Sequence, residues 1–287
     1  MSSQKKVGLA LGGGGARGLA HIGVIKELLR AGVSIDYIAG TSMGSIVGGW
    51  YAATKDIELL ESIFLKLRYR DIFPIGEFFN AKKGAALFQG ESAMKMLGPD
   101  FRNINIEECK IPFRAVATDM NNGDRVVLKT GKLADAVRAS SSIPVLFPPV
   151  KIGEMLLADG GFSDPVPVDV VKEMGADVVI AVDVSSKWTN PSGDGSADIR
   201  NVYSMFSSAL SIVSYQLTKE ALANADVVLH PPISRFDWLE FGKGGEIMKV
   251  GAEEARLHLK KIREKLDMAQ PKRTIGEKFM DFITSDE

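Results

Sequence analysis

The sequence predicts an α/β fold with a largely parallel sheet that helices cover on both faces, and three observations support this prediction. Short apolar runs typical of buried strands alternate along the chain with stretches of helical character. Three glycine-containing motifs, at residues 12–18, 40–44 and 159–161, each follow directly on a predicted strand. The length of 287 residues is enough for one large α/β domain with a sizeable core.

The first part of the chain contains the predicted strands that carry two of these motifs. Residues 7–11 form an apolar run that glycines end, which predicts a buried strand followed by a loop. A helix is expected at 16–30, a second short strand at 35–39, a helix rich in small residues at 43–53, and another helix at 57–67. The aromatic-rich region 69–90 that follows is less regular.

The remaining elements are predicted from their turn and breaker residues. Two strands, 113–118 and 125–128, are separated by an Asn-Asn-Gly-Asp turn typical of a hairpin, and prolines end a helix at 133–140. Strands are further expected at 155–158, 177–184 and 226–230, a polar surface loop at 185–196, and helices at 91–97, 168–174, 198–224 and 245–266.

The composition is that of an ordinary globular protein, with 45% hydrophobic and 25% charged residues. The net charge of -1 creates no global field that would favour nucleic acid. The single cysteine, Cys109, allows no internal disulfide and fits a reducing compartment. No stretch is long and apolar enough to span a bilayer or to act as a signal peptide, so we expect a cytoplasmic protein that touches membranes only at the surface.

We expect a single domain over residues 7–270, because no internal repeat or break in composition divides it. Its motif-bearing part covers residues 7–184, and the part from 198 to 270 is mostly helical. Residues 1–6 and 271–287 are expected to be polar tails.

The glycine run at residues 12–18 fits two different sites. Gly13, Gly15 and Gly18 have the G-x-G-x-x-G spacing of a dinucleotide site, but an oxyanion site equally needs backbone N–H groups without a Cβ in front of them. A dinucleotide site also needs an acidic residue at the carboxyl end of the second strand, whereas Asp36 lies at that strand's start. The run therefore favours an oxyanion cradle.

The segment Gly40-Thr41-Ser42-Met43-Gly44 fits the nucleophile-elbow pattern G-x-S-x-G. Glycines at both ends of this pattern relieve crowding where a strand turns sharply into a helix, and a strand and a helix are predicted on its two sides. The helix N-terminus would also favour negative charge near Ser42. The alternative interpretation is a simple strand-to-helix turn with a capping serine or threonine.

The third motif places a carboxylate, Asp159, after a predicted strand and before Gly160 and Gly161. At the carboxyl end of its strand, this carboxylate could reach the elbow of a neighbouring strand on the same edge of the sheet. An Asp-Gly pair that only forms a turn is the alternative. Taken together, the three motifs predict acyl transfer, with an oxyanion site, a nucleophile and a base.

The base is the main choice that the residues leave open, because serine hydrolases commonly use histidine. His21 is expected to pack or cap a helix, and His258 lies on a charged helix face. The order Ser42, Asp159, His230 would suit a triad of the α/β-hydrolase type, but only one predicted strand precedes that of Ser42. A Ser-Asp dyad is therefore preferred over a triad with His230.

These motifs resemble those of the patatin-like phospholipase family, particularly its short bacterial members. The resemblance rests on residues 13–18, 40–44 and 159–161 and on the segment 139–149, and it extends over about residues 7–184. It implies a three-layer α/β/α sandwich that hydrolyses acyl esters of lipids. By this resemblance, Ser42 is the nucleophile and Asp159 its general base. The resemblance also implies that the oxyanion hole is formed by Gly13, Gly14 and Gly15. The supporting residues that it implies are Arg17, Gly40, Gly44, Gly160 and Gly161.

The expected substrate is a lipid or another acyl ester, with no cofactor, no metal and no nucleic acid partner. The segment 236–241 (Phe-Asp-Trp-Leu-Glu-Phe) and the aromatics of 69–88 could line an acyl pocket or rest on a bilayer, although ordinary core packing is preferred for both. The alternative functions are a non-catalytic regulatory or interaction protein that keeps the fold, and a nucleotide-binding module.

Overall fold

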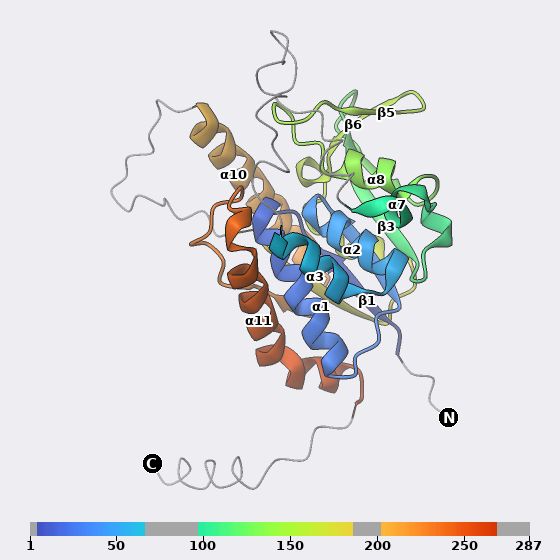
Figure 1. Cartoon of the computed structure of the whole chain (residues 1–287), viewed down its shortest axis with the longest axis vertical. Helices are drawn as coiled ribbons and strands as arrows, with labels where there is room; N and C mark the ends of the chain where they lie inside the picture. Colours follow the sequence, from blue (N-terminus) through green and yellow to red (C-terminus); the bar gives the residue numbers. More distant parts are fainter. Residues whose placement is uncertain (1–4, 67–96, 186–201, 269–287) are drawn as a thin grey trace, which may run out of the picture.

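A computed structural model describes residues 5–66, 97–185 and 202–268 and contains a central eight-stranded sheet (Figure 1). The strand order is β5-β6-β3-β2-β1-β7-β8, and β4 pairs with β3 outside this path. The strands are β1 (Val7–Leu11), β2 (Tyr37–Thr41), β3 (Phe113–Asp119), β4 (Arg125–Leu128), β5 (Val150–Ile152), β6 (Met155–Asp159), β7 (Val178–Val182) and β8 (Val227–Leu229).

The sheet is parallel from β3 through β2, β1 and β7 to β8, as the alternation of strands and helices predicts. Among the described strands, the antiparallel ones lie on the β3 side, where β4 and β6 both pair with β3 and β5 pairs with β6. Short turns join β3 to β4 and β5 to β6, and such turns reverse the chain, which accounts for these two antiparallel pairs; β6 pairs with β3 across a longer connection that includes α8.

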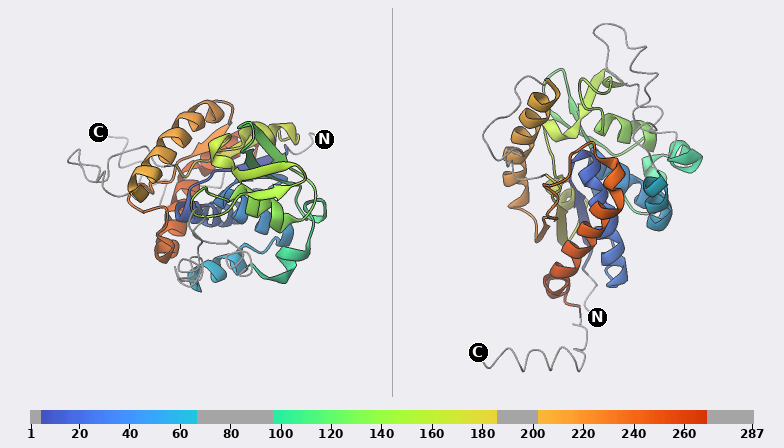
Figure 2. Two further views of the ribbon diagram at one scale, coloured as in Figure 1. Left: turned by 90° about the horizontal axis from the view of Figure 1, so that it is seen from above. Right: turned by 60° about the vertical axis from the view of Figure 1, so that its left-hand side comes forward.

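Helices cover both faces of the sheet (Figures 1 and 2). On one face α1 packs along α11 and lies beside α2 and α3, while α8 packs on β3. On the other face α9 packs on β1, β2 and β7 and lies beside α10. The helices are α1 (Ala20–Arg30), α2 (Met43–Thr54), α3 (Ile57–Lys66), α7 (Gly98–Asn103), α8 (Leu133–Ser140), α9 (Val168–Glu173), α10 (Val202–Leu222) and α11 (Gly244–Lys265). The predicted α/β fold with a largely parallel sheet is therefore confirmed.

The alternation of side chains along β1 shows how the sheet separates two cores. Leu9 and Leu11 belong to the large core beneath α1, α2 and α11, whereas Ala10 belongs to the smaller core beneath α9. A Cβ added at Gly8 would lie only 2.0 Å from Cγ1 of Val171 on α9. Small residues on this face thus allow α9 to pack directly against the strand that carries the glycine loop.

The element boundaries differ from the predictions in a few places. The second strand begins at Tyr37 rather than at residue 35, because the backbone and the carboxylate of Asp36 already bond to Val7 ahead of the ladder. The first helix is preceded by a 3₁₀ turn over Gly15–Leu19, and β5 is an addition to the predicted strands. The predictions for residues 69–96, 186–196 and 271–287 lie outside the described residues.

Within the described ranges, no helix combines the length and the apolar composition that crossing a membrane requires.

Candidate active site

Ser42 lies on a strained turn between β2 and α2. Its backbone has φ 53° and ψ -123°, a conformation that side-chain-bearing residues rarely adopt. A Cβ at Gly40 would lie 2.4 Å from the carbonyl oxygen of Gly44, and a Cβ at Gly44 would lie 2.1 Å from that of Leu11. The two glycines therefore let the chain turn this sharply, as the G-x-S-x-G pattern predicts.

Hydrogen bonds hold this turn from both sides. The Ser42 amide donates to Oγ of Ser140 at 3.0 Å, which ties the turn to the end of α8. The Ser42 carbonyl accepts from the amide of Ser45 at 2.9 Å and from its hydroxyl at 2.7 Å. The strain at Ser42 is thus maintained by its surroundings. The role of Ser140 was not predicted, because a contact between residues so distant in the sequence has no local signal.

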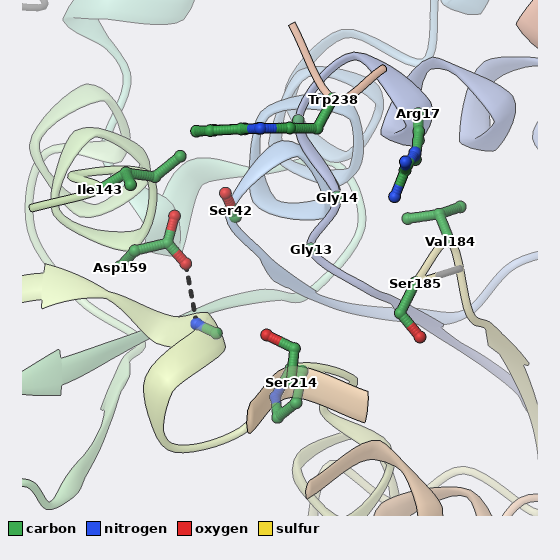
Figure 3. A pocket seen from close by; sticks show the side chains of 13 residues that line it. Gly13, Gly14, Arg17, Ser42, Ile143, Asp159, Val184, Ser185, Ser214 and Trp238 are labelled. Atoms are coloured by element: carbon green, nitrogen blue, oxygen red, sulfur yellow. Dashed lines mark hydrogen bonds between the residues drawn. The ribbon is translucent and has the colours of Figure 1, made fainter. Parts of the chain in front are cut away.

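Asp159, the last residue of β6, is buried, and one of its two carboxylate oxygens has no hydrogen-bond partner. Oδ1 accepts from the amide of Gly161 at 2.8 Å, and Oδ2 is the oxygen without a partner. Figure 3 shows this second oxygen on the side of the pocket where Ser42 lies. A Cβ at Gly160 would lie 2.2 Å from the carbonyl oxygen of Val116, so the turn after Asp159 packs tightly on β3.

The environment of Asp159 raises the pKa of its carboxyl group toward neutral pH. Burial raises the pKa of the Asp159 carboxyl from 3.8 to about 6, because the ionised form loses hydration. The Ser42 hydroxyl and the Gly161 amide, which favour the ionised form, offset part of this effect on the pKa. Asp159 is thus a carboxylate at neutral pH, but a more basic one than an exposed aspartate.

Asp159 approaches Ser42 by a route that differs from the predicted one. β6 runs antiparallel to β3, so its carboxyl end points away from the edge at which β2 ends. In the ladder, Thr41 lies beside Val116 and Asp159 lies beside Ala117. β6 therefore enters the sheet from the edge at which β2 ends and stops at the level of the elbow. The expectation that the two strands end on the same edge was wrong.

The glycine loop runs past Ser42 with only some of its amides occupied. The amide of Gly12 donates to Val182 and that of Gly13 to Pro165, each at 3.0 Å. The amides of Gly14 and Gly15 make no hydrogen bond within the part of the chain that the structure describes. These two N–H groups remain available to an anion.

The conformation of this loop requires glycine. Gly15 has φ 56°, and a Cβ there would lie 2.3 Å from the carbonyl oxygen of Trp238. The amide of Ala16 donates to that same carbonyl at 2.7 Å. Arg17 donates from Nε to the carbonyl of Phe236 at 2.8 Å. The loop is thereby joined to the segment 236–241.

These groups meet in a cavity of about 80 Å³ (Figure 3). Trp238 lines it, whereas its neighbours Phe236 and Phe241 are buried in the core. The preferred interpretation of the segment 236–241 as core is thus correct for the two phenylalanines and wrong for Trp238. The residues that line the cavity are Gly13, Gly14, Gly15, Arg17, Ser42, Ile143, Asp159, Gly161, Pro165, Val184, Ser185, Ser214 and Trp238.

None of the three histidines lines this cavity. His21 is fully buried, donates from Nε2 to the carbonyl of Gly12 at 2.8 Å, and has its pKa lowered by burial to about 4. His230 pairs through Nδ1 with Oδ2 of Asp183 at 3.1 Å, and His258 lies on α11. Beside Ser42 the cavity is therefore lined by a carboxylate, that of Asp159, and by no histidine.

Comparisons with known proteins found one matching family profile and several related sequences. Residues 9–172 match the family profile described as patatin-like phospholipase. Lysophospholipase nte1 of Emericella nidulans is 32% identical over 292 residues, which cover 93% of this chain and 19% of that protein. An uncharacterized NTE family protein of Mycobacterium tuberculosis is 37% identical over 201 residues, which cover 69% of this chain and 54% of that protein.

The chain thus spans about a fifth of the fungal relative and about half of the mycobacterial one. Among solved structures, VipD from Legionella pneumophila matches with a TM-score of 0.48 and 15% identity over 90% of this chain and 67% of that one.

Proposed function

Because this chain belongs to the patatin-like phospholipase family, we propose that it is a serine hydrolase that cleaves lipid acyl esters through a Ser42–Asp159 dyad. The observation that carries the proposal is the buried Oδ2 of Asp159, which has no hydrogen-bond partner and lines the same cavity as the strained Ser42. A buried carboxylate oxygen without a partner is costly unless it accepts a proton or a hydrogen bond during the reaction.

The first half of the reaction forms an acyl-enzyme. Oδ2 of Asp159 accepts the proton of the Ser42 hydroxyl as Oγ attacks the ester carbonyl carbon. The carbonyl oxygen becomes an oxyanion, which accepts hydrogen bonds from the amides of Gly14 and Gly15. In this proposal Gly13, which was expected to take part in the oxyanion hole, donates nothing to the oxyanion, because its amide already donates to the carbonyl of Pro165. When the C–O bond breaks, the leaving alcohol takes the proton from Asp159.

The second half releases the fatty acid. Asp159 removes a proton from a water molecule, whose oxygen attacks the acyl carbon, and the same two amides stabilise the second oxyanion. The proton then returns to Oγ of Ser42, and the carboxylate of Asp159 is regenerated. A pKa of about 6 suits this role, because the group is ionised at neutral pH and yet binds a proton more readily than an exposed aspartate does.

The substrate that we propose is a membrane or micellar lipid with a carboxylic ester. The half-buried indole of Trp238 and the side chain of Ile143 give the cavity an apolar wall, which suits the part of an acyl chain next to the ester. We further propose that the protein works in the cytoplasm and meets lipid by peripheral contact, with the segment of Trp238 at the lipid surface.

Labelling with a fluorophosphonate probe tests the proposal. The wild type and His230→Ala should both be labelled, whereas Ser42→Ala should not be labelled and Asp159→Asn should be labelled at least about 100-fold more slowly. Ser62→Ala, which changes a half-buried serine of α3 whose hydroxyl donates to the carbonyl of Leu59, serves as a control for nonspecific labelling. Loss of labelling in His230→Ala would favour a triad. A folded wild-type protein that takes no label and hydrolyses no lipid ester would favour a non-catalytic protein.

A further inference from the structure

A second, larger hollow lies next to the Ser42 cavity. Its volume is about 650 Å³, and it lies where β7 and β8 end, against α10. Ser185 lines both spaces, and Ser214 of the first cavity is followed on α10 by Tyr215 of the second. Figure 3 shows Ser185 and Ser214 on the side of the first cavity away from Ile143. The residues that line the second hollow are Asp183, Ser185, Tyr215, Thr218, Lys219, Leu222, His230, Pro231, Pro232, Ile233 and Ser234.

Two hydroxyl groups in the wall of this hollow have no partner. Thr218 is only 2% exposed, and its Oγ1 makes no hydrogen bond, although a threonine within a helix usually donates to the carbonyl four residues before it. Oγ of Ser185 is likewise buried without a partner. Buried hydroxyls of this kind are rare because each costs free energy, so a pair of them at one hollow indicates a missing acceptor.

The charged groups around the hollow favour an anion. Both oxygens of Asp183 are already engaged, Oδ1 by the amide of Ser185 at 2.8 Å and Oδ2 by Nδ1 of His230 at 3.1 Å. Lys219 lies over the ring of Tyr215, with Nζ 4.5 Å from the ring centroid, and none of the described carboxylates pairs with it. The hollow therefore offers a cation and two hydroxyl donors, while its one lining carboxylate is occupied.

We propose that this hollow binds the phosphate of a lipid substrate whose acyl ester lies at Ser42. This inference rests on the proposed function, because it assigns the hollow to the leaving group of the same reaction. The small cavity at Ser42 has room for little more than the reacting ester, whereas the larger one is of the size that binds small molecules in proteins. A glycerophosphate group would extend past Ser185, and its phosphate would meet Thr218 and Lys219.

Two ligands that differ only in the phosphate test the inference by binding. The ligands are 1-octanoylglycerol 3-phosphate and 1-octanoylglycerol, titrated calorimetrically into the full chain with Ser42→Ala to prevent turnover. Thr218→Val removes only a hydroxyl and Lys219→Met only a charge, so each should raise the Kd of the phosphate ligand about 10-fold. Lys249→Met, at an exposed position of α11, is the matched control and should change neither Kd.

Hydrolysis of the same two compounds separates this inference from the proposed function. With Ser42 restored, Thr218→Val and Lys219→Met should each lower the ratio of kcat/KM for the phosphate ester over the neutral ester about 10-fold. A wild type that hydrolyses neither compound would overturn the proposed function, while the titration would still decide the phosphate site. Equal Kd values for the phosphate ligand in the control and in both variants would overturn the phosphate site alone.

Discussion

Replacement of Asp159 by asparagine should stabilise the folded protein at pH 8 while it removes the proposed catalytic base. Burial raises the pKa of this carboxyl from 3.8 to about 6, so the ionised group destabilises the fold at every pH above about 6. At about 1.4 kcal/mol per pH unit, the difference amounts to about 3 kcal/mol. An asparagine keeps the acceptor for the Gly161 amide, carries no charge and can donate to the Ser42 hydroxyl.

The sign of the effect follows from the raised pKa. Because the folded protein binds this proton more tightly than the unfolded chain does, the contribution of Asp159 to stability is most favourable below about pH 4 and is lost as the pH rises through 6. The advantage of Asp159→Asn should therefore be about 3 kcal/mol at pH 8 and shrink toward zero near pH 4.

Urea unfolding of both proteins at pH 8, 6 and 4.5, followed by circular dichroism, measures this difference in the free energy of unfolding. Asp135→Asn, which changes a carboxylate in the first turn of α8, serves as a control for the loss of one negative charge. A difference between wild type and Asp159→Asn that stays the same from pH 8 to 4.5, or an asparagine variant less stable than wild type at pH 8, would refute the reasoning.

Three further predictions concern the same site. The kcat/KM for an ester should fall about tenfold per pH unit below pH 6 as Asp159 is protonated; a flat profile from pH 4 to 8 would exclude it as the base. Gly44→Ala should lower the free energy of unfolding by about 3 kcal/mol in urea titrations, because its Cβ would overlap the Leu11 carbonyl. In the control Gly242→Ala, the added Cβ meets nothing within 4 Å, and the free energy of unfolding should change by less than about 0.5 kcal/mol. Trp238→Ala should weaken cosedimentation with liposomes about fivefold, and unchanged partition would argue against membrane contact there.

The parts of the fold that the sequence predicts well are those with a local physical cause. The strand at Val7–Leu11 and the helix at Leu133–Ser140 have the predicted bounds, because a run of apolar residues or a pair of flanking breakers defines each of them. The elbow at Ser42 was predictable for the same reason. The steric contact at Gly40 is with Gly44 in the same turn, so this part of the pattern has a local cause, whereas a Cβ at Gly44 would meet the carbonyl oxygen of Leu11 on β1.

The predictions that failed depend on contacts between distant segments. The orientation of β6 is decided by its pairing with β3 and by the turn to β5, and no periodicity within residues 155–159 contains that information. Trp238 lines the cavity because its carbonyl bonds to Ala16, more than two hundred residues earlier in the chain. The same aromatic segment gives two core residues and one cavity residue, which its composition alone does not distinguish.

The sequence by itself determined which chemical groups are present and how each is presented on its own turn: a serine on a strained elbow, a glycine loop and a carboxylate followed by glycines. Only the tertiary structure decided which of these groups meet. It brings Asp159 to the level of Ser42 through an antiparallel strand and pairs His230 with Asp183. It also leaves Thr218 and Ser185 without acceptors beside a second hollow. The physical reason is that steric limits on a turn act over a few residues, whereas strand pairing and burial join segments far apart in the sequence.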